Sequence, residues 1–130
     1  MSWHEPYLTL PFESHSKNGG VDCWGLCRKV LAEVRGIVLP SYHERYGASN
    51  RHKEVEAAIR AGLAESWVRT DDPKPFDLVI FNLGGKPAHV GLVFEAPKFL
   101  HADPQFRVRL DEWDSWEWQP RIEGFYRYAA

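Results

Sequence analysis

A chain of 130 residues is long enough to bury a core and short enough to form one domain. Apolar residues make up 44% of it and charged residues 26%, which excludes a disordered chain. The formal net charge of −2 argues against nucleic acid as the partner, and no stretch reaches the ~18–20 apolar residues of a membrane span. We therefore expect one globular domain over residues 1–130.

The N-terminus reads MSWHEPYLTL and lacks a basic region followed by a continuous apolar run. It does not have the pattern of a signal peptide, so we expect synthesis in the cytoplasm. The two cysteines, Cys23 and Cys27, are four residues apart on one predicted helix, which disfavours a disulfide between them.

The first predicted helix begins within GGVDCWGLCRKVL, residues 19–31. Its apolar residues recur at the spacing of one helix face and are Cys23, Leu26, Cys27, Val30, Leu31 and Val34. Gly36 is a suitable helix stop. A second helix is predicted from about Arg51 to Gly62, with Asn50 as its N-cap.

The second half of the chain is rich in predicted strands. A glycine-rich turn joins the first two strands as an antiparallel hairpin. The predicted strands are 77–81, 89–95, 98–102, 106–110 and 122–128. Helices followed by strands indicate an α+β fold. The acidic, tryptophan-rich segment 111–120 is interpreted as a loop with anchoring tryptophans or as a contact surface.

The position of Cys23 supports two interpretations. Cysteine is among the most often buried residues, so Cys23 is on one interpretation a small core residue. On the other it is a nucleophile, because backbone N–H groups and the dipole at a helix N-terminus favour a thiolate.

Two of the six histidines, His89 and His101, lie in or beside apolar strand candidates. A histidine on a strand is well fixed, as a general base and its orienting partner must be. Neighbouring strands would bring the two imidazoles together. Cys23, His89 and His101 would then be nucleophile, base and orienting group, or the same histidines would be half-buried polar residues.

A zinc site is the alternative use of these side chains. Cys23, Cys27, His89 and His101 are suitable ligand types for zinc. Two cysteines on one helix are not the usual short-loop arrangement, so this alternative is the weaker one.

Three segments together resemble the NlpC-type cell-wall peptidases, a family of papain-like cysteine peptidases. GGVDCWGLCRKVL resembles the block that contains the nucleophile. KPFDLVIFNLGGKPAHVGLVFE, residues 74–95, resembles the block that contains the base. FLHA, residues 99–102, resembles the block of the last catalytic residue. The three blocks occur in the expected order.

The resemblance implies a papain-like fold with N-terminal helices packed on an antiparallel sheet. It makes Cys23 the nucleophile, His89 the general base and His101 its orienting group. It makes Asp22 a structural or substrate-binding residue, and Trp24 is a further candidate for substrate binding. It implies hydrolysis of amide bonds in peptidoglycan stem peptides, without a metal or organic cofactor.

A narrower likeness concerns the branch found in tail-assembly and tail-tip proteins of long-tailed phages. It is indicated by Trp24 in DCWGL, by GIVLPSY at 36–42 and by IEGFYRY at 122–128. It implies assembly into a phage tail, with tail-tip proteins as partners, and the alternative of a structural tail protein with little or no turnover.

One position departs from the family pattern. Many members have a tyrosine upstream of the cysteine that helps the oxyanion or the substrate, whereas Phe12 stands there in this chain. A phenyl ring cannot donate a hydrogen bond. Tyr7 is the one candidate in the N-terminal segment for a substitute donor.

Overall fold

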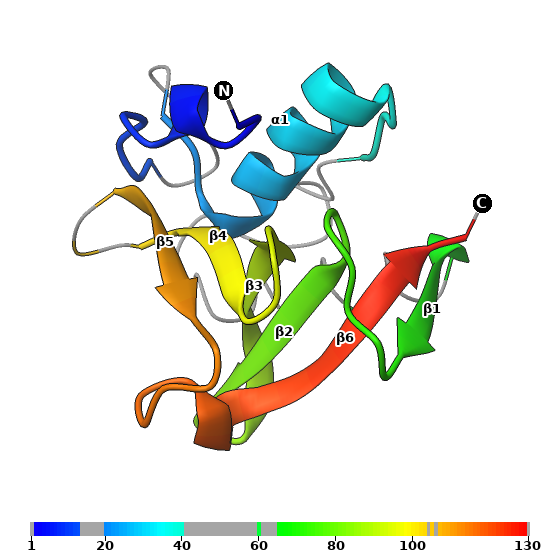
Figure 1. The fold of residues 1–130 in the computed structure, drawn as a ribbon, viewed down its shortest axis with the longest axis vertical. Coiled ribbons are helices and arrows are strands. Elements are labelled where there is room, and N and C mark those ends of the chain that lie inside the picture. The colour runs from blue at the N-terminus through cyan, green and yellow to red at the C-terminus, as the bar shows by residue number, and fades with distance from the viewer. Residues whose placement is uncertain are drawn as a thin grey trace.

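The computed structural model describes residues 2–13, 20–40, 60, 65–103, 105 and 107–129 (Figure 1). The α-helix α1 spans Cys23–Arg35, and two short 3₁₀ helices are η1 (Glu5–Tyr7) and η4 (Gln119–Arg121). The strands are β1 (Trp67–Thr70), β2 (Leu78–Leu83), β3 (Lys86–Val93), β4 (Lys98–Ala102), β5 (Val108–Glu112) and β6 (Ile122–Tyr128).

The helix α1 follows the predicted pattern closely. It ends where Gly36 adopts a left-handed conformation with φ of 69°, and the Gly36 N–H donates to the Ala32 carbonyl. Glycine takes this conformation without a steric cost, which is why it terminates helices. The second predicted helix, at about 51–62, falls almost entirely outside the described residues.

The six strands form one antiparallel sheet in the order β1-β6-β2-β3-β4-β5. The predicted hairpin is present as β2 and β3, joined through Gly84 and Gly85, which both have positive φ. Several expectations need correction. The strands predicted at 77–81 and 89–95 run over Leu78–Leu83 and Lys86–Val93. Strand β1 was not predicted, and β5 runs over Val108–Glu112 rather than 106–110.

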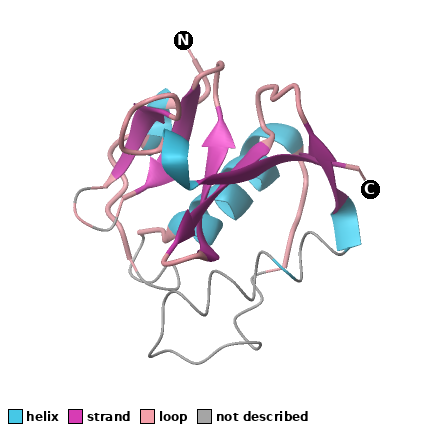
Figure 2. Cartoon of the chain, turned by 90° about the horizontal axis from the view of Figure 1, so that it is seen from below, coloured by secondary structure: helices cyan, strands magenta, loops and turns pink. Residues whose placement is uncertain are grey.

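Buried side chains gather in two clusters, one on each face of the sheet. The first cluster joins the apolar face of α1 to residues of β3 and β4 such as Val90, Leu92 and Leu100. The second contains Val79, Phe81, Val93, Phe99 and Trp118. Figure 1 shows α1 across one side of the sheet, and Figure 2 shows the same layers from below.

The α+β class and the antiparallel sheet are thus confirmed, whereas only one helix is seen to pack on the sheet among the described residues. Within the same part of the chain, no helix is long and apolar enough to cross a membrane.

Candidate active site

Cys23 is the first residue of α1, and Asp22 is the N-cap that begins the helix there. Asp22 has an extended backbone, and its carboxylate accepts a hydrogen bond from the Gly25 N–H at 2.6 Å. Such a cap satisfies one of the N–H groups that a helix leaves without an internal acceptor. The geometry gives Asp22 a structural role, and its predicted contact with substrate stays a prediction.

Both cysteines are buried, with Cys23 4% exposed, but they lie one helical turn apart at different positions on α1. Cys27 is fully buried, and burial raises the pKa of its thiol well above the ordinary value, with further contributions from Cys23 and Asp22. Cys23 lies at the positive end of the helix dipole, where a thiolate is favoured. Cys27 is therefore a core residue, as its position in the sequence indicates.

We expect iodoacetamide to alkylate Cys23 in the native protein and to leave Cys27 unmodified, because a buried thiol with a raised pKa forms little thiolate. Mass spectrometry of peptides after brief labelling at pH 6–7 measures both sites. Unfolding in urea should then make the two cysteines equally reactive. Equal labelling of the two in the native protein would contradict an activated Cys23.

The two histidines singled out in the sequence form a hydrogen-bonded pair. His89 on β3 and His101 on the adjacent β4 are 6% and 1% exposed. The Nε2 atom of His89 and the Nδ1 atom of His101 are 2.8 Å apart. The expectation that neighbouring strands bring these imidazoles together is confirmed.

Asp111 extends this pair on the third strand, β5, and was not among the predicted site residues. Its Oδ2 lies 2.8 Å from Nε2 of His101, and its Oδ1 accepts a hydrogen bond from Nη2 of Arg109 at 3.0 Å. Burial by itself raises the pKa of Asp111, but the hydrogen bonds from His101 and Arg109 outweigh it and hold the pKa below its usual value. Asp111 is therefore an anion at neutral pH.

An ionised Asp111 determines where the protons of the pair lie. The carboxylate can only accept, so Nε2 of His101 donates to it and Nδ1 of His101 becomes an acceptor. Nε2 of His89 then donates to Nδ1 of His101. The remaining nitrogen of His89, Nδ1, is left unprotonated, which is the form that can take a proton.

The sequence contains a signal for Asp111 that the loop-like composition of 111–120 obscures. In residues 107–111, polar Arg107, Arg109 and Asp111 alternate with apolar Val108 and Leu110. The alternation is that of a strand with one buried face and continues to residue 111.

Aromatic rings enclose the histidine pair. The Trp118 ring stacks on His89 with centroids 5.6 Å apart and planes inclined by 17°, and it meets His101 edge-on at 5.2 Å. Phe99 lies 4.7 Å from His101. Hydrogen bonds are stronger where water is excluded, so these rings stabilise the pair. The sequence predicts Trp118 within a loop with anchoring tryptophans or within a contact surface, and gives no sign of its place beside the histidines.

Close packing of β3 against β4 depends on Gly91. A Cβ atom at Gly91 would lie 2.8 Å from the ring of Phe99 and 3.4 Å from Cβ of His101. The absence of a side chain lets these two residues occupy the space beside His89. A bulge between β2 and β3 at Phe81/Asn82 adjoins His89, and such bulges change the direction of nearby side chains.

Trp24 is 5% exposed, and its indole N–H donates to the Pro40 carbonyl at 3.1 Å. This bond ties the first turn of α1 to the segment that follows the helix. The observed contacts of Trp24 are structural, and the substrate-binding role predicted for it stays a prediction.

Tyr7 is committed to a partner away from the first turn of α1. Its hydroxyl donates to Oε1 of Glu33 at 2.7 Å, and burial, followed by the bond and charge of Glu33, raises the pKa of Tyr7 to about 12. Glu33 is ten residues after Cys23, or about 15 Å along the helix. Tyr7 is therefore not a substitute for the phenol missing at Phe12, whose backbone pairs with Val21.

We expect Tyr7→Phe to lower the free energy of unfolding by about 1 kcal/mol, the usual net value of one hydrogen bond, without changing catalysis. The raised pKa means that the contribution of Tyr7 is present below pH 10 and is lost as the pH rises towards 12. Urea unfolding at pH 8 and pH 11 should show the difference between wild type and variant shrinking. A fall in kcat would instead place the Tyr7 hydroxyl in the reaction.

The zinc alternative receives no support from the geometry. Among the residues that the structure describes, no group of three or more His, Cys, Asp or Glu side chains is arranged to hold a metal ion. Both ring nitrogens of His101 already face protein partners, His89 and Asp111.

Comparisons with known proteins identify the family and the fold of this chain. The model of the NlpC/P60 family matches residues 10–127. A comparison with curated proteins found no match.

Solved structures with the same fold include an NLP/P60 family protein similar to a lipoprotein, from Staphylococcus aureus. It is 22% identical with a TM-score of 0.67, over 98% of this chain and 39% of that one. The NlpC/p60 domain of the peptidoglycan hydrolase SagA is 20% identical with a TM-score of 0.61, over 95% and 91%. The peptidoglycan hydrolase RipB from Mycobacterium tuberculosis is 19% identical with a TM-score of 0.56, over 94% and 58%. This chain thus spans less than two thirds of the staphylococcal protein and of RipB.

Proposed function

This chain belongs to the NlpC/P60 family, and we propose that it is a cysteine peptidase that hydrolyses amide bonds in peptidoglycan stem peptides. The observation that carries the proposal is the chain of hydrogen bonds from His89 through His101 to Asp111, together with Cys23 at the start of α1. Two of the proteins that share the fold are named peptidoglycan hydrolases.

In the first step the Cys23 thiol gives its proton to Nδ1 of His89, and the sulfur attacks the carbonyl carbon of the substrate amide. His101 and Asp111 stabilise the imidazolium that forms. The negative charge on the substrate oxygen is favoured by the N–H groups and dipole of the first turn of α1.

In the second step the C–N bond breaks, and His89 returns the proton to the leaving amine. A thioester then joins the substrate acyl group to Cys23. Water, deprotonated by His89, attacks the thioester and releases a carboxylic acid, which restores the thiol. One amide bond and one water are consumed per turnover, and no cofactor is needed.

The direct test incubates the protein with purified muropeptides and identifies the products by mass spectrometry. Cleavage should add one water across a stem-peptide amide and should disappear in Cys23→Ala. Intact muropeptides after prolonged incubation with a folded wild-type protein would refute the proposal for these substrates.

A second candidate function is a structural protein of a phage tail that keeps the fold with little turnover. The observation that favours it is the missing phenol, since Phe12 has no hydroxyl and Tyr7 is bonded to Glu33. Tail-tip partners and assembly into a tail are predictions from the sequence likeness, and production in the bacterial cytoplasm is a prediction from the N-terminal pattern. All three belong to this candidate as well as to the first.

Phe12→Tyr tests whether the missing donor limits the reaction. Losing one oxyanion donor costs about 10²–10³ in rate, so restoring it should raise kcat by tenfold or more with little change in KM. Steady-state kinetics on one muropeptide measures both constants, with Tyr7→Phe as the control that removes a remote phenol. A lower kcat in a folded Phe12→Tyr protein would mean that the donor lies elsewhere.

A further inference from the structure

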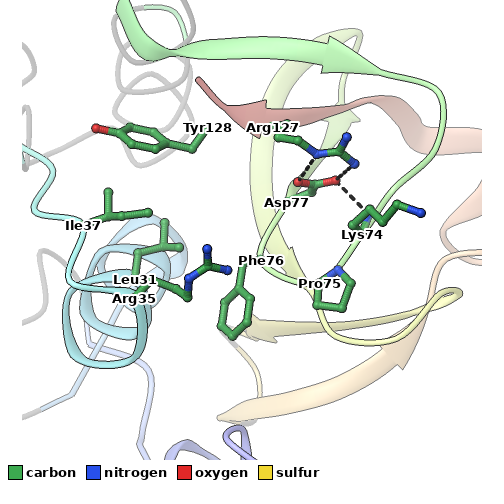
Figure 3. Close-up of a pocket in the computed structure, with 9 residues that line it drawn as sticks. All are labelled: Leu31, Arg35, Ile37, Lys74, Pro75, Phe76, Asp77, Arg127 and Tyr128. Carbon is green, nitrogen blue, oxygen red and sulfur yellow. Dashed lines mark hydrogen bonds and ion pairs between the residues drawn. The ribbon is translucent and has the colours of Figure 1, made fainter. Parts of the chain in front are cut away.

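A pocket of about 260 Å³ opens at the C-terminal end of α1 (Figure 3). Its walls come from the end of α1, from the turn before β2 and from the end of β6, and they include Arg35, Phe76 and Tyr128. Arg35 follows Cys23 by twelve residues, about 18 Å along the helix axis. The pocket is thus separate from the candidate active site.

Arg35 provides a positive charge at the pocket. Its guanidinium lies over the Phe76 ring at 5.0 Å, and it has no hydrogen bond or ion pair within the described part of the chain. The neighbouring Arg127 is neutralised, because it contacts the buried Asp77 at 3.1 and 2.8 Å. The ammonium of Lys74 pairs with Asp72 at 3.0 Å.

A basic residue in the last turn of a helix is favoured by the helix dipole, and this effect alone can explain the presence of Arg35. The dipole does not account for Phe76, which has a φ of 75°. This conformation is costly for a bulky residue, about 1–3 kcal/mol, and such strain is concentrated at functional sites. The strained turn presents an aromatic ring to the pocket beside the Arg35 guanidinium (Figure 3).

Some exposed apolar residues are neighbours, in the sequence or in the sheet, of residues that line the pocket. The exposed large hydrophobic residues of the described part of the chain are Val34, Val38, Val68 and Trp116. Val34 and Val38 lie in the last turn of α1 and just after it, and Val68 on β1 is paired with Arg127 of the pocket wall. Val34 and Val38 thus add exposed apolar side chains to the same segment that supplies Arg35 and Ile37 to the pocket wall.

Trp116, the fourth of these residues, is 90% exposed in the loop between β5 and η4. The loop is held on both sides: the Trp113 N–H donates to the Pro97 carbonyl at 3.0 Å, and the Trp118 N–H to the Ser115 hydroxyl at 3.3 Å. A loop whose backbone is held in this way loses little freedom on binding, which favours Trp116 as an anchor.

The charges of the two surfaces are complementary. The exposed acidic residues Asp114 and Glu117 flank Trp116, whereas the uncommitted charge at the pocket is the cation Arg35. Trp, Tyr and Arg are the residue types that most often dominate the energy of protein interfaces. In the proposed contact Trp116 would supply the tryptophan, and the pocket would supply Tyr128 and Arg35.

We propose that the pocket receives the Trp116 loop of a second copy of this chain. In Figure 1 the β5–η4 loop lies at the lower left, and the end of α1 lies at the upper right, so one molecule cannot fill its own pocket. The contact is head-to-tail, and repetition of it produces open chains or rings. The proposal is independent of catalysis. It places the contact surface that the sequence predicts within 111–120 at residues 114–117.

Sedimentation velocity of the purified chain from about 10 µM to 1 mM tests self-association. One anchoring ring buries far less than the ~1,600 Å² of a stable interface, so we expect a weak equilibrium that high salt weakens further. Trp116→Ala and Arg35→Glu should each remain monomeric. Arg107→Glu makes the same charge change at another exposed arginine and should associate as wild type does.

Mixing the two variants that do not self-associate tests the head-to-tail geometry. Trp116→Ala keeps an intact pocket and Arg35→Glu keeps an intact loop, so an equimolar mixture can form one contact per pair. We expect a dimer that does not grow with concentration, and circular dichroism should show both variants folded. A monomeric wild type at 1 mM, association that survives both substitutions, or a mixture that stays monomeric would each overturn the proposal.

Discussion

Cys23→Ala and His89→Ala should each lower kcat/KM for muropeptide hydrolysis by about 10⁴ or more, because each removes a group that forms or breaks bonds. Truncating a catalytic residue in other hydrolases has effects of this size. Neither substitution should unfold the protein. Steady-state kinetics with circular dichroism on the same samples measures both properties.

Cys27→Ala is the matched control, since it removes the same atom one helical turn later. Cys27 is completely buried, so its loss should cost stability, about 0.5–3 kcal/mol, and leave the folded enzyme active. The reverse pattern, in which Cys23→Ala unfolds the domain and His89→Ala has no effect on hydrolysis, would mean that Cys23 is only a core residue.

The parts of the fold that were predicted correctly have local causes. The helix α1 is specified within its own thirteen residues and its caps, by Asp22 before it, the spacing of its apolar residues and Gly36 after it. The pairing of His89 with His101 follows from two short strands joined by a short turn. These features depend on residues close in sequence, which pattern analysis can read.

The parts that were missed depend on contacts between distant segments. Strand β1 has only four residues, and it exists through pairing with β6, more than fifty residues later. The Tyr7–Glu33 bond spans 26 residues and leaves no mark in the sequence pattern. The alternation of residues 107–111 indicates a strand that reaches Asp111, but it cannot show that Asp111 meets His101, because the register of β5, which places Asp111 opposite Phe99, is set by pairing with β4.

Asp111 provides the second large effect, through the tautomers of the two histidines. In Asp111→Asn the side chain keeps one acceptor oxygen but must face both His101 and Arg109. Arg109 can only donate, so the oxygen turns towards it and the NH₂ group faces Nε2 of His101. The proton of His101 then moves from Nε2 to Nδ1. Nδ1 of His101 now donates to Nε2 of His89, which must give up its own proton to accept the hydrogen bond. His89 becomes protonated on Nδ1 and cannot act as a base.

We expect Asp111→Asn to lower kcat by about 10²–10³ with little change in KM, less than the ~10⁴ seen when the residue next to a catalytic histidine is changed in this way. The free energy of unfolding of the variant should also lack the pH-dependent contribution that Asp111 makes in the wild type. Because the pKa of Asp111 is held low, its contribution to stability is present above pH 4 and is lost as the pH falls below that value. Wild type and variant should therefore converge in stability in acid.

Arg109→Met in the Asp111→Asn background separates a tautomer effect from simple damage to the site. Without Arg109, the asparagine oxygen can turn to Nε2 of His101 and restore the original protonation of both histidines. We expect the double variant to recover at least tenfold in kcat over Asp111→Asn. Nitrogen-15 NMR of the imidazoles should show the tautomers of His89 and His101 change in the single variant and revert in the double variant. Losses in kcat that simply multiply, with unchanged tautomers, would mean that Asp111 only supports the packing of β5 against β4.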